Sequence, residues 1–216
     1  MDSRSSEPAP GPAREDALPA STATAVKIVV VGGFGVGKTT MVGSVSEIRP
    51  LTTEETMTEV SVGVDDVRGV EQKNATTVAM DFGRISINSE LVLYLFGTPG
   101  QQRFWFLWAG LFEGALGAVV LVDTRRLEAS FDVIGRLEAG GVPFIVAVNG
   151  FPDAPIHPLD EVRAALDLPA AVPVVACDAR SRASSRDTLL ALMRYLYWLS
   201  THSAAPVAAS AATEQT

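Results

Sequence analysis

The chain has 216 residues, 47% of them hydrophobic, and carries a formal net charge of −8 at pH 7. This length and content are enough for one sizeable core, so a single domain with tails is expected. The acidic balance offers no basic stripe for a phosphate backbone, which argues against a nucleic-acid partner. No apolar run approaches the roughly 20 residues that span a bilayer, so we expect no direct membrane insertion.

The single cysteine and the two ends of the chain indicate the compartment and the extent of the domain. Cys177 lies in an apolar run and is typical of a core residue in a reducing compartment. A cytoplasmic location is therefore expected, peripheral to a membrane only through partners. Residues 1–24 and 203–216 are dominated by small and polar residues with little to bury. They are predicted to be disordered tails, which leaves residues 25–202 as the domain.

The most informative stretch follows the apolar run 26–31, the first expected strand. A glycine, four free positions and then Gly, Lys and Thr match the phosphate-binding P-loop, whose glycines let backbone N–H groups face the β-phosphate. Lys38 supplies a positive charge to the β and γ oxygens, and the Thr39 hydroxyl ligates Mg²⁺. The expected nucleotide-binding residues here are Gly32, Gly33, Phe34, Gly35, Val36, Gly37, Lys38, Thr39 and Thr40.

Beyond the P-loop, short apolar runs alternate with amphipathic or mixed segments, as is typical of a parallel sheet covered on both faces. Only Asn88, Ser89 and Glu90 separate the second and third runs, so these two strands must form an antiparallel hairpin. The expected strands are 26–31, 77–87, 91–96, 117–122, 143–148 and 172–176, and the expected helices are 38–47, 101–112, 128–139, 159–166 and 184–200. The pattern predicts an α/β fold: a P-loop NTPase of Ras-like GTPase topology, with a six-stranded, mostly parallel sheet flanked by helices.

Residues 49–75 interrupt this alternation with Thr, Glu, Asp and Gly. A connection of this length in a compact domain is usually functional or mobile. It lies between the P-loop helix and the second strand, where small GTPases carry their first switch. A surface insertion with a small hairpin around 60–64 fits the same residues equally well.

The third strand ends in Gly97-Thr98-Pro99-Gly100-Gln101, which resembles the second switch of Ras-like GTPases, where Asp, two variable residues, Gly and Gln follow a strand. The resemblance gives Gly100 the N–H that senses the γ-phosphate and gives Gln101 the role of orienting the attacking water. Gly97 replaces the aspartate that normally holds a magnesium-bound water. This replacement weakens the expected metal site.

Two other aspartates lie in segments that resemble metal-binding motifs. Asp123 closes the fourth strand and could take the place of the missing ligand, although a turn-forming aspartate is the ordinary interpretation of this position. Asp81 receives no role, because the string Asp81-Phe82-Gly83 matches a protein-kinase metal motif without the accompanying catalytic loop.

Base recognition in Ras-like GTPases normally comes from an Asn-Lys-x-Asp motif after the fifth strand. Here Asn149 is in the expected place, but Gly150 replaces the lysine and Asp153 stands one position late. A carboxylate that accepts guanine N1–H and the 2-amino proton excludes adenine, so the shift puts guanine preference in doubt. Ala179 matches the alanine whose N–H receives guanine O6, and Arg180 replaces the usual lysine, although a plain strand-to-helix turn also explains that loop.

Together with the strand beginning Thr77-Val78-Ala79-Met80-Asp81, the altered switch makes the chain similar to bacterial MglA-type small GTPases. It is most similar to the GTP-binding component of actinobacterial conservon operons, often labelled ATP/GTP-binding proteins. The resemblance covers residues 25–202 and implies a nucleotide-controlled switch that works with a roadblock-type protein and a sensor histidine-kinase-like protein. It also implies a switch threonine that reaches Mg²⁺, for which Thr77 fits best; Thr76 is adjacent, and either can be a β-branched strand residue.

The sequence therefore predicts a GTP hydrolase that binds GTP and GDP with Mg²⁺, acts as a signalling switch and turns over slowly. Slow turnover is expected because the metal-bridging aspartate is missing and no arginine finger is identifiable in the chain. Two alternatives stay open. One is a degenerate GTPase-like scaffold that binds a nucleotide permanently or not at all and acts through the aromatic segment 104–108. The other is an ATP/GTP binder without guanine specificity.

Overall fold

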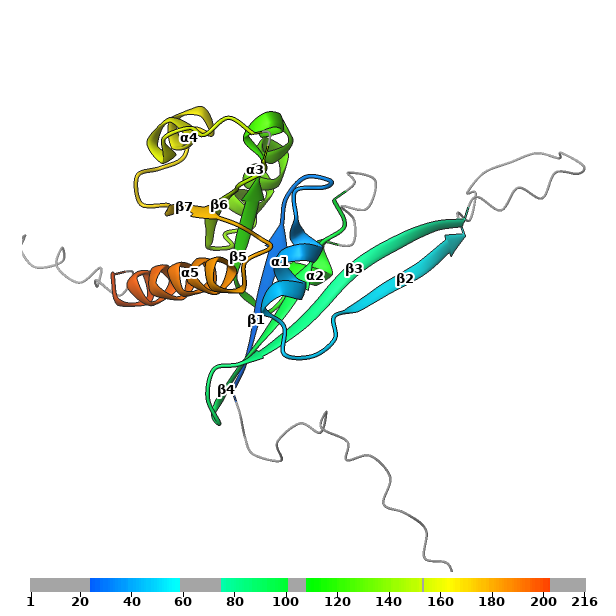
Figure 1. Ribbon diagram of the computed structural model, residues 1–216. Coiled ribbons are helices and arrows are strands. Elements are labelled where there is room, and N and C mark those ends of the chain that lie inside the picture. The colour runs from blue at the N-terminus through cyan, green and yellow to red at the C-terminus, as the bar shows by residue number, and fades with distance from the viewer. Residues whose placement is uncertain (1–23, 59–74, 101–107, 153, 203–216) are drawn as a thin grey trace, which may run out of the picture.

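The computed structural model describes residues 24–58, 75–100, 108–152 and 154–202, with the backbone alone at 52–58, 75–79 and 108–109. The strands form one seven-stranded sheet in the order β2-β3-β4-β1-β5-β6-β7 (Figure 1). Their bounds are β1 (Thr24–Val31), β2 (Leu51–Thr58), β3 (Ala75–Ser86), β4 (Leu91–Gly97), β5 (Ala115–Val122), β6 (Phe144–Asn149) and β7 (Val174–Cys177). The helices are α1 (Lys38–Val45), α2 (Trp108–Phe112), the 3₁₀ helix η2 (Thr124–Ser130), α3 (Phe131–Ala139), α4 (Leu159–Ala165) and α5 (Arg182–His202).

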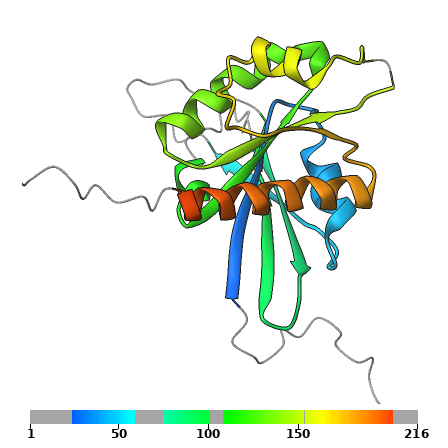
Figure 2. The same ribbon diagram turned by 90° about the vertical axis from the view of Figure 1, so that its left-hand side faces the viewer.

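The central strand β1 is buried on both of its faces. Ile28 and Val30 belong to the core beneath α1 and α5, whereas Val29 and Val31 belong to the core beneath α3 and α4. All four side chains are fully buried, and each contributes about 1.5–3 kcal/mol through removal from water. The two helical layers on opposite faces are visible in Figure 2, where α5 crosses in front of the sheet. A strand buried in this way leads its chain to the carboxyl edge of the sheet, where ligands bind in open α/β folds.

The predicted fold class is confirmed: the six expected strands are present, and the sheet is mostly parallel. β1 pairs in parallel with β4 and β5, and β6 pairs in parallel with β5 and β7. The hairpin across Asn88, Ser89 and Glu90 is antiparallel, as its short turn requires.

A seventh strand, β2, lies in the segment that was expected to be irregular. It pairs antiparallel with β3 from Leu51 opposite Phe82 to Thr58 opposite Ala75, and the two strands extend beyond the rest of the sheet in Figure 1. β2 is rich in threonine, and an edge strand needs no continuous apolar run, which explains why hydrophobicity did not indicate it. The alternative hairpin around 60–64 lies outside the described residues.

The two largest differences from the expected helices concern those expected over 128–139 and 101–112. The helix expected over 128–139 begins at Phe131, because η2 precedes it and Arg126 interrupts the turn with φ −147° and ψ 53°. Of the helix expected over 101–112, only α2 lies within the described residues. Both tails lie outside them except Thr24, whose N–H donates to the Glu90 carbonyl at 2.6 Å. Among the described helices, none combines the length and apolar character needed to cross a bilayer.

Candidate functional site

The glycine loop follows β1 and runs directly into α1, as a P-loop must. Gly32, Gly35 and Gly37 have φ of 143°, 73° and 106°, conformations that residues with a Cβ rarely adopt. A Cβ on Gly32 would lie 2.4 Å from the Leu121 carbonyl oxygen. A Cβ on Gly37 would lie 2.7 Å from Nδ2 of Asn149. Glycine is therefore required both by the dihedral angles and by close neighbours of the loop.

Lys38 is buried at the start of α1, and its ammonium group lies against the loop backbone. Nζ donates to the carbonyl oxygens of Gly32 at 2.9 Å and Gly33 at 2.7 Å. Burial lowers the pKa of Lys38 from 10.5 to about 8, although the nearby charge of Asp81 acts in the opposite direction. Gly100 packs on the same group, since a Cβ there would lie 2.8 Å from Nζ and 2.8 Å from the Phe34 Cα. The loop after β4 is thus in contact with the phosphate loop.

The lowered pKa predicts that nucleotide binding takes up a proton above about pH 8, because bound phosphates would keep Lys38 charged. Apparent affinity should then fall as pH rises above 8, by at most about tenfold per unit. Calorimetric titration of nucleotide at pH 9 in two buffers of different ionisation enthalpy measures the proton uptake, and equal apparent enthalpies would contradict the prediction.

The same lowered pKa affects the stability of the nucleotide-free fold. Its free energy of unfolding should rise between pH 8 and 10.5, where the unfolded chain binds more protons than the folded chain.

Asp81, to which the sequence assigned no role, occupies the space left by the missing switch aspartate. It stands opposite Gly97 in the β3–β4 register, and a Cβ on Gly97 would lie 2.9 Å from Asp81 Oδ2. The Thr39 hydroxyl donates to the same Oδ2 at 2.6 Å, although Asp81 is only 5% exposed. A carboxylate therefore meets the P-loop threonine, but it comes from β3 rather than from β4.

The oxygens around Thr39 suit a hard cation. Mg²⁺ in nucleotide sites takes one or two protein oxygens together with phosphates and waters, and Thr39 and Asp81 supply such a pair. Thr98, next to Gly97, is only 2% exposed, and its hydroxyl has no hydrogen-bond partner within the described part of the chain. A water or ligand oxygen would satisfy this orphaned group. The described residues contain no group of three His, Cys, Asp or Glu side chains that could hold a metal by themselves.

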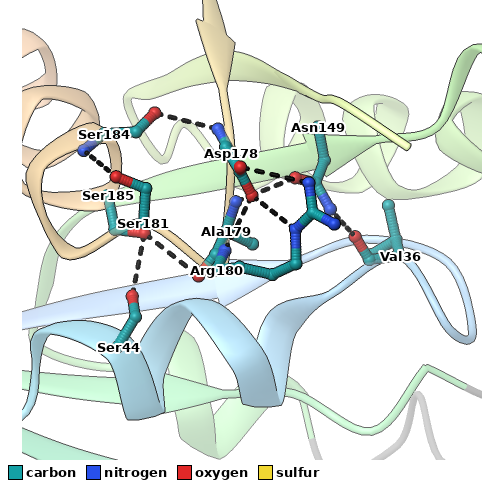
Figure 3. A network of polar contacts seen from close by, with 9 residues as sticks. All are labelled: Val36, Ser44, Asn149, Asp178, Ala179, Arg180, Ser181, Ser184 and Ser185. Atoms are coloured by element: carbon teal, nitrogen blue, oxygen red, sulfur yellow. Dashed lines mark hydrogen bonds and ion pairs between the residues drawn. The ribbon is translucent and has the colours of Figure 1, made fainter. Parts of the chain in front are cut away.

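Asn149 joins the P-loop to the loop after β7, as Figure 3 shows. Its Nδ2 donates to the Val36 carbonyl at 2.9 Å, and its Oδ1 accepts from the backbone N–H of Ala179 at 2.9 Å. Asn149 is 5% exposed and Ala179 is 1% exposed. The N–H that the family resemblance assigns to the base oxygen is therefore already bonded in this structure.

Several predicted site residues are placed only in part. Thr77 lies in β3 opposite Thr56, and its side chain is not among those described. Gln101 and Asp153 lie outside the described residues. Thr40 is exposed at the start of α1 and lines a cavity together with Asn149. The roles predicted for Thr77, Gln101 and Asp153 stay predictions.

Asp123 is a turn-forming aspartate, which is the ordinary interpretation of its position. It caps η2 by accepting from the backbone N–H of Arg125 at 3.0 Å, and the Arg125 guanidinium binds both carboxylate oxygens at 2.9 and 2.8 Å. The hydrogen bond from the Arg125 side chain is the main reason why the pKa of Asp123 is lowered. Arg126 lies 3.6 Å from the same carboxylate. These cations engage the carboxylate that a metal would need.

The glycine loop at the end of the central strand, its buried lysine and the threonine–carboxylate pair define a nucleotide-binding P-loop protein with the fold of a G-domain. More particularly, the chain belongs to the family described as conserved hypothetical ATP binding proteins, whose sequence model matches residues 30–198. An uncharacterized protein of Methanocaldococcus jannaschii is 30% identical over 126 residues, which cover 57% of this chain and 69% of that protein. The FeoB G-domain from Methanococcus jannaschii superposes with a TM-score of 0.52 at 17% identity, covering 80% of this chain and 98% of that domain. At this identity the likeness shows the fold alone.

Proposed function

We propose that this chain is a nucleotide-controlled switch that binds GTP and GDP with Mg²⁺ and hydrolyses GTP slowly. The observation that carries the proposal is the 2.6 Å hydrogen bond between Thr39 and Asp81, made beside Gly97. In this proposal Asp81 takes the place of the aspartate that the switch motif lacks. Its contact with the P-loop threonine supports a working site over a degenerate scaffold.

Each group has a role in this proposal. The loop amides and Lys38 would hold the phosphates, and Thr39 and Asp81 would hold the metal directly or through water. A part for Thr77 in holding the metal rests on the family resemblance. Mg²⁺, when held by these residues, would supply positive charge to offset the charge that develops on the phosphates. Gly100 senses the γ-phosphate, and Gln101 orients the attacking water. The base lies near Asn149, Asp153 and Ala179.

Slow hydrolysis is proposed because Arg126, which lies beside the P-loop, is bound to other groups of the protein. Nη2 of Arg126 donates to the Phe34 carbonyl at 3.1 Å and lies 3.6 Å from Asp123. An arginine that neutralises charge on the transferred phosphoryl group contributes about 10³- to 10⁵-fold in rate. Without it, turnover on the order of 10⁻⁴ to 10⁻³ per second is expected.

A single-turnover assay tests the proposal. The stripped chain, loaded with GTP and Mg²⁺, should release phosphate slowly, and chelation of Mg²⁺ should speed nucleotide dissociation. Thr39→Val keeps the side-chain volume but removes the hydroxyl. The factor by which Mg²⁺ slows nucleotide dissociation should therefore be about tenfold smaller in this variant. Thr124→Val is the matched control, because its exposed hydroxyl bonds the Pro155 carbonyl instead. Rapid unassisted turnover, or a Thr39→Val variant with unchanged Mg²⁺ dependence, would contradict the proposal.

The signalling role and the partners rest on the resemblance to MglA-type and conservon GTPases. In this proposal a roadblock-type protein and a sensor histidine-kinase-like protein bind the chain in a nucleotide-dependent manner, at a membrane if the sensor is there. Affinity chromatography with the GDP-loaded and GTP-analogue-loaded chain tests this. Equal capture in both states would favour the scaffold alternative.

A second candidate is an ATP/GTP binder without guanine specificity. The description of its family as ATP-binding favours this candidate, as does the displacement of Asp153 by one position in the base motif. The two candidates differ in one measurable ratio, the affinity for GDP over that for ADP. A ratio near one would support the second candidate.

A further inference from the structure

A cavity of about 140 Å³ adjoins the P-loop on the side of β6 and β7. On one side it is lined by Gly35, Gly37 and Thr40. On the other side it is lined by Asn149, Gly150, Phe151, Ala179 and Arg180. With phosphates held in the loop, a nucleotide would place its nucleoside on this side of the site.

Several backbone donors in the loops after β6 and β7 are already bonded. Gly150 N–H donates to the Cys177 carbonyl at 2.8 Å, and Ala179 N–H donates to Asn149 Oδ1 at 2.9 Å. Arg180 N–H donates to Asp178 Oδ1 at 3.0 Å, and Ser181 N–H donates to the Asp178 carbonyl at 2.9 Å. A carbonyl oxygen on a bound base would therefore need a donor other than these N–H groups.

Arg180 is the cationic side chain that lines the cavity, and it is paired with Asp178. Its Nε and Nη2 donate to the two oxygens of Asp178 at 2.9 and 3.1 Å (Figure 3). A guanidinium carries five N–H groups in a planar fork, so this pair uses one edge and leaves the Nη1–Nη2 edge for a ligand. The side chain is 61% exposed, which leaves that edge accessible.

We propose that Arg180 reads the N7 and O6 edge of a guanine base. This inference rests on the proposed nucleotide-binding function and names the residue that sets its base preference. Guanine offers two acceptors on this edge, which match two parallel N–H donors of a guanidinium. Adenine offers N7 and a 6-amino donor, so its amine would face a donor without a partner. Discrimination of about tenfold to a hundredfold follows from such a pair.

Base analogues separate this readout from one by Asp153. A carboxylate at Asp153 would read N1–H and the 2-amino group, whereas Arg180 reads N7 and O6. 7-Deaza-GDP lacks the N7 acceptor and should bind the unmodified chain about tenfold more weakly than GDP. IDP lacks the 2-amino group but keeps O6 and N7, so it should bind nearly as well as GDP.

The test compares Arg180→Ala and Arg180→Lys with Arg182→Ala, which removes the same charge from α5, two residues away. Arg180→Ala should lower the ratio of GDP to ADP affinity by about tenfold or more and should make GDP and 7-deaza-GDP equivalent. Arg180→Lys keeps the charge but not the planar fork of N–H donors, so it should lower the ratio of GDP to ADP affinity as well. Arg182→Ala should leave it unchanged, and thermal melting checks that every variant is folded.

The outcomes distinguish a failure of base readout by Arg180 from a failure of the proposed nucleotide binding. Nucleotide binding with a GDP to ADP ratio that Arg180→Ala does not change would overturn this inference alone. Equal binding of 7-deaza-GDP and GDP by the unmodified chain would do the same. If the unmodified chain binds no nucleotide at all, the proposed function fails and this inference fails with it.

Discussion

Asp81→Ala should weaken Mg²⁺-dependent nucleotide binding by about 10- to 100-fold, the range seen when a group that supports a metal site is removed. The physical reason is that Asp81 Oδ2 lies 2.6 Å from the Thr39 hydroxyl. The switch motif itself has Gly97 in place of the usual aspartate, so it provides no carboxylate there. Dissociation of a fluorescent GDP analogue, measured with Mg²⁺ and with a chelator, gives the effect directly. The rate in chelator should change little, because the metal is then absent in both proteins.

A carboxylate swap makes this prediction sharper. The double variant Asp81→Gly with Gly97→Asp moves the carboxylate from β3 to β4 and keeps one glycine in this pair of facing positions. It should recover much of the Mg²⁺ effect lost in Asp81→Ala. Gly97→Asp alone should destabilise the fold, since its Cβ would lie 2.9 Å from Asp81 Oδ2 and 3.0 Å from Asp81 Cβ. If Asp81→Ala keeps the full Mg²⁺ dependence, Asp81 has no part in the metal site.

Asn149→Ala should lower both stability and nucleotide affinity. The change leaves the Val36 carbonyl and the Ala179 N–H without their partner in a buried region. Each unsatisfied buried group costs about 1–3 kcal/mol, so a loss of roughly 2–6 kcal/mol is expected for the two groups. For a domain of this size, the midpoint of thermal unfolding should fall by roughly 4–24 °C.

The effect on binding follows from the same two bonds. Because Asn149 ties the P-loop to the β7 loop, its loss should loosen the phosphate and nucleoside sides together and weaken GDP binding by roughly 100-fold. Asn88→Ala is the matched control, because Asn88 makes its bond to the Glu90 N–H on the exposed hairpin. Melting curves and GDP titrations of both variants measure the difference. Equal melting temperatures for Asn149→Ala and the unmodified chain would show that the bridge is not structural.

Much of the fold could be predicted because its strands are apolar on both faces. β1, β4, β5 and β6 were placed to within two residues, since continuous burial leaves a continuous apolar run. β2 escaped notice because an edge strand of threonines lacks that signal. The start of α3 was misplaced because η2 and α3 share one helical pattern, and backbone dihedrals rather than composition separate them.

The candidate site was predictable where its chemistry is local and not where it depends on pairing. The P-loop residues are consecutive, so their spacing alone predicts the motif. Asp81 becomes relevant only through the register of β3 against β4, which places it opposite Gly97. A signal was present, because both residues lie eight positions from Ser89 at the centre of the hairpin turn. The occupied N–H of Ala179 had no such signal, because it depends on the Asn149 side chain.

The proposed function requires this chain to hold a nucleotide–magnesium complex on Lys38, Thr39 and Asp81. The most direct test strips the purified chain of nucleotide and titrates it with GDP, GTP, ADP and ATP, each with Mg²⁺ and with a chelator. We predict that guanine nucleotides bind more tightly than adenine nucleotides and that Mg²⁺ tightens their binding. The absence of nucleotide binding, or affinities that Mg²⁺ does not change, would contradict the proposed function.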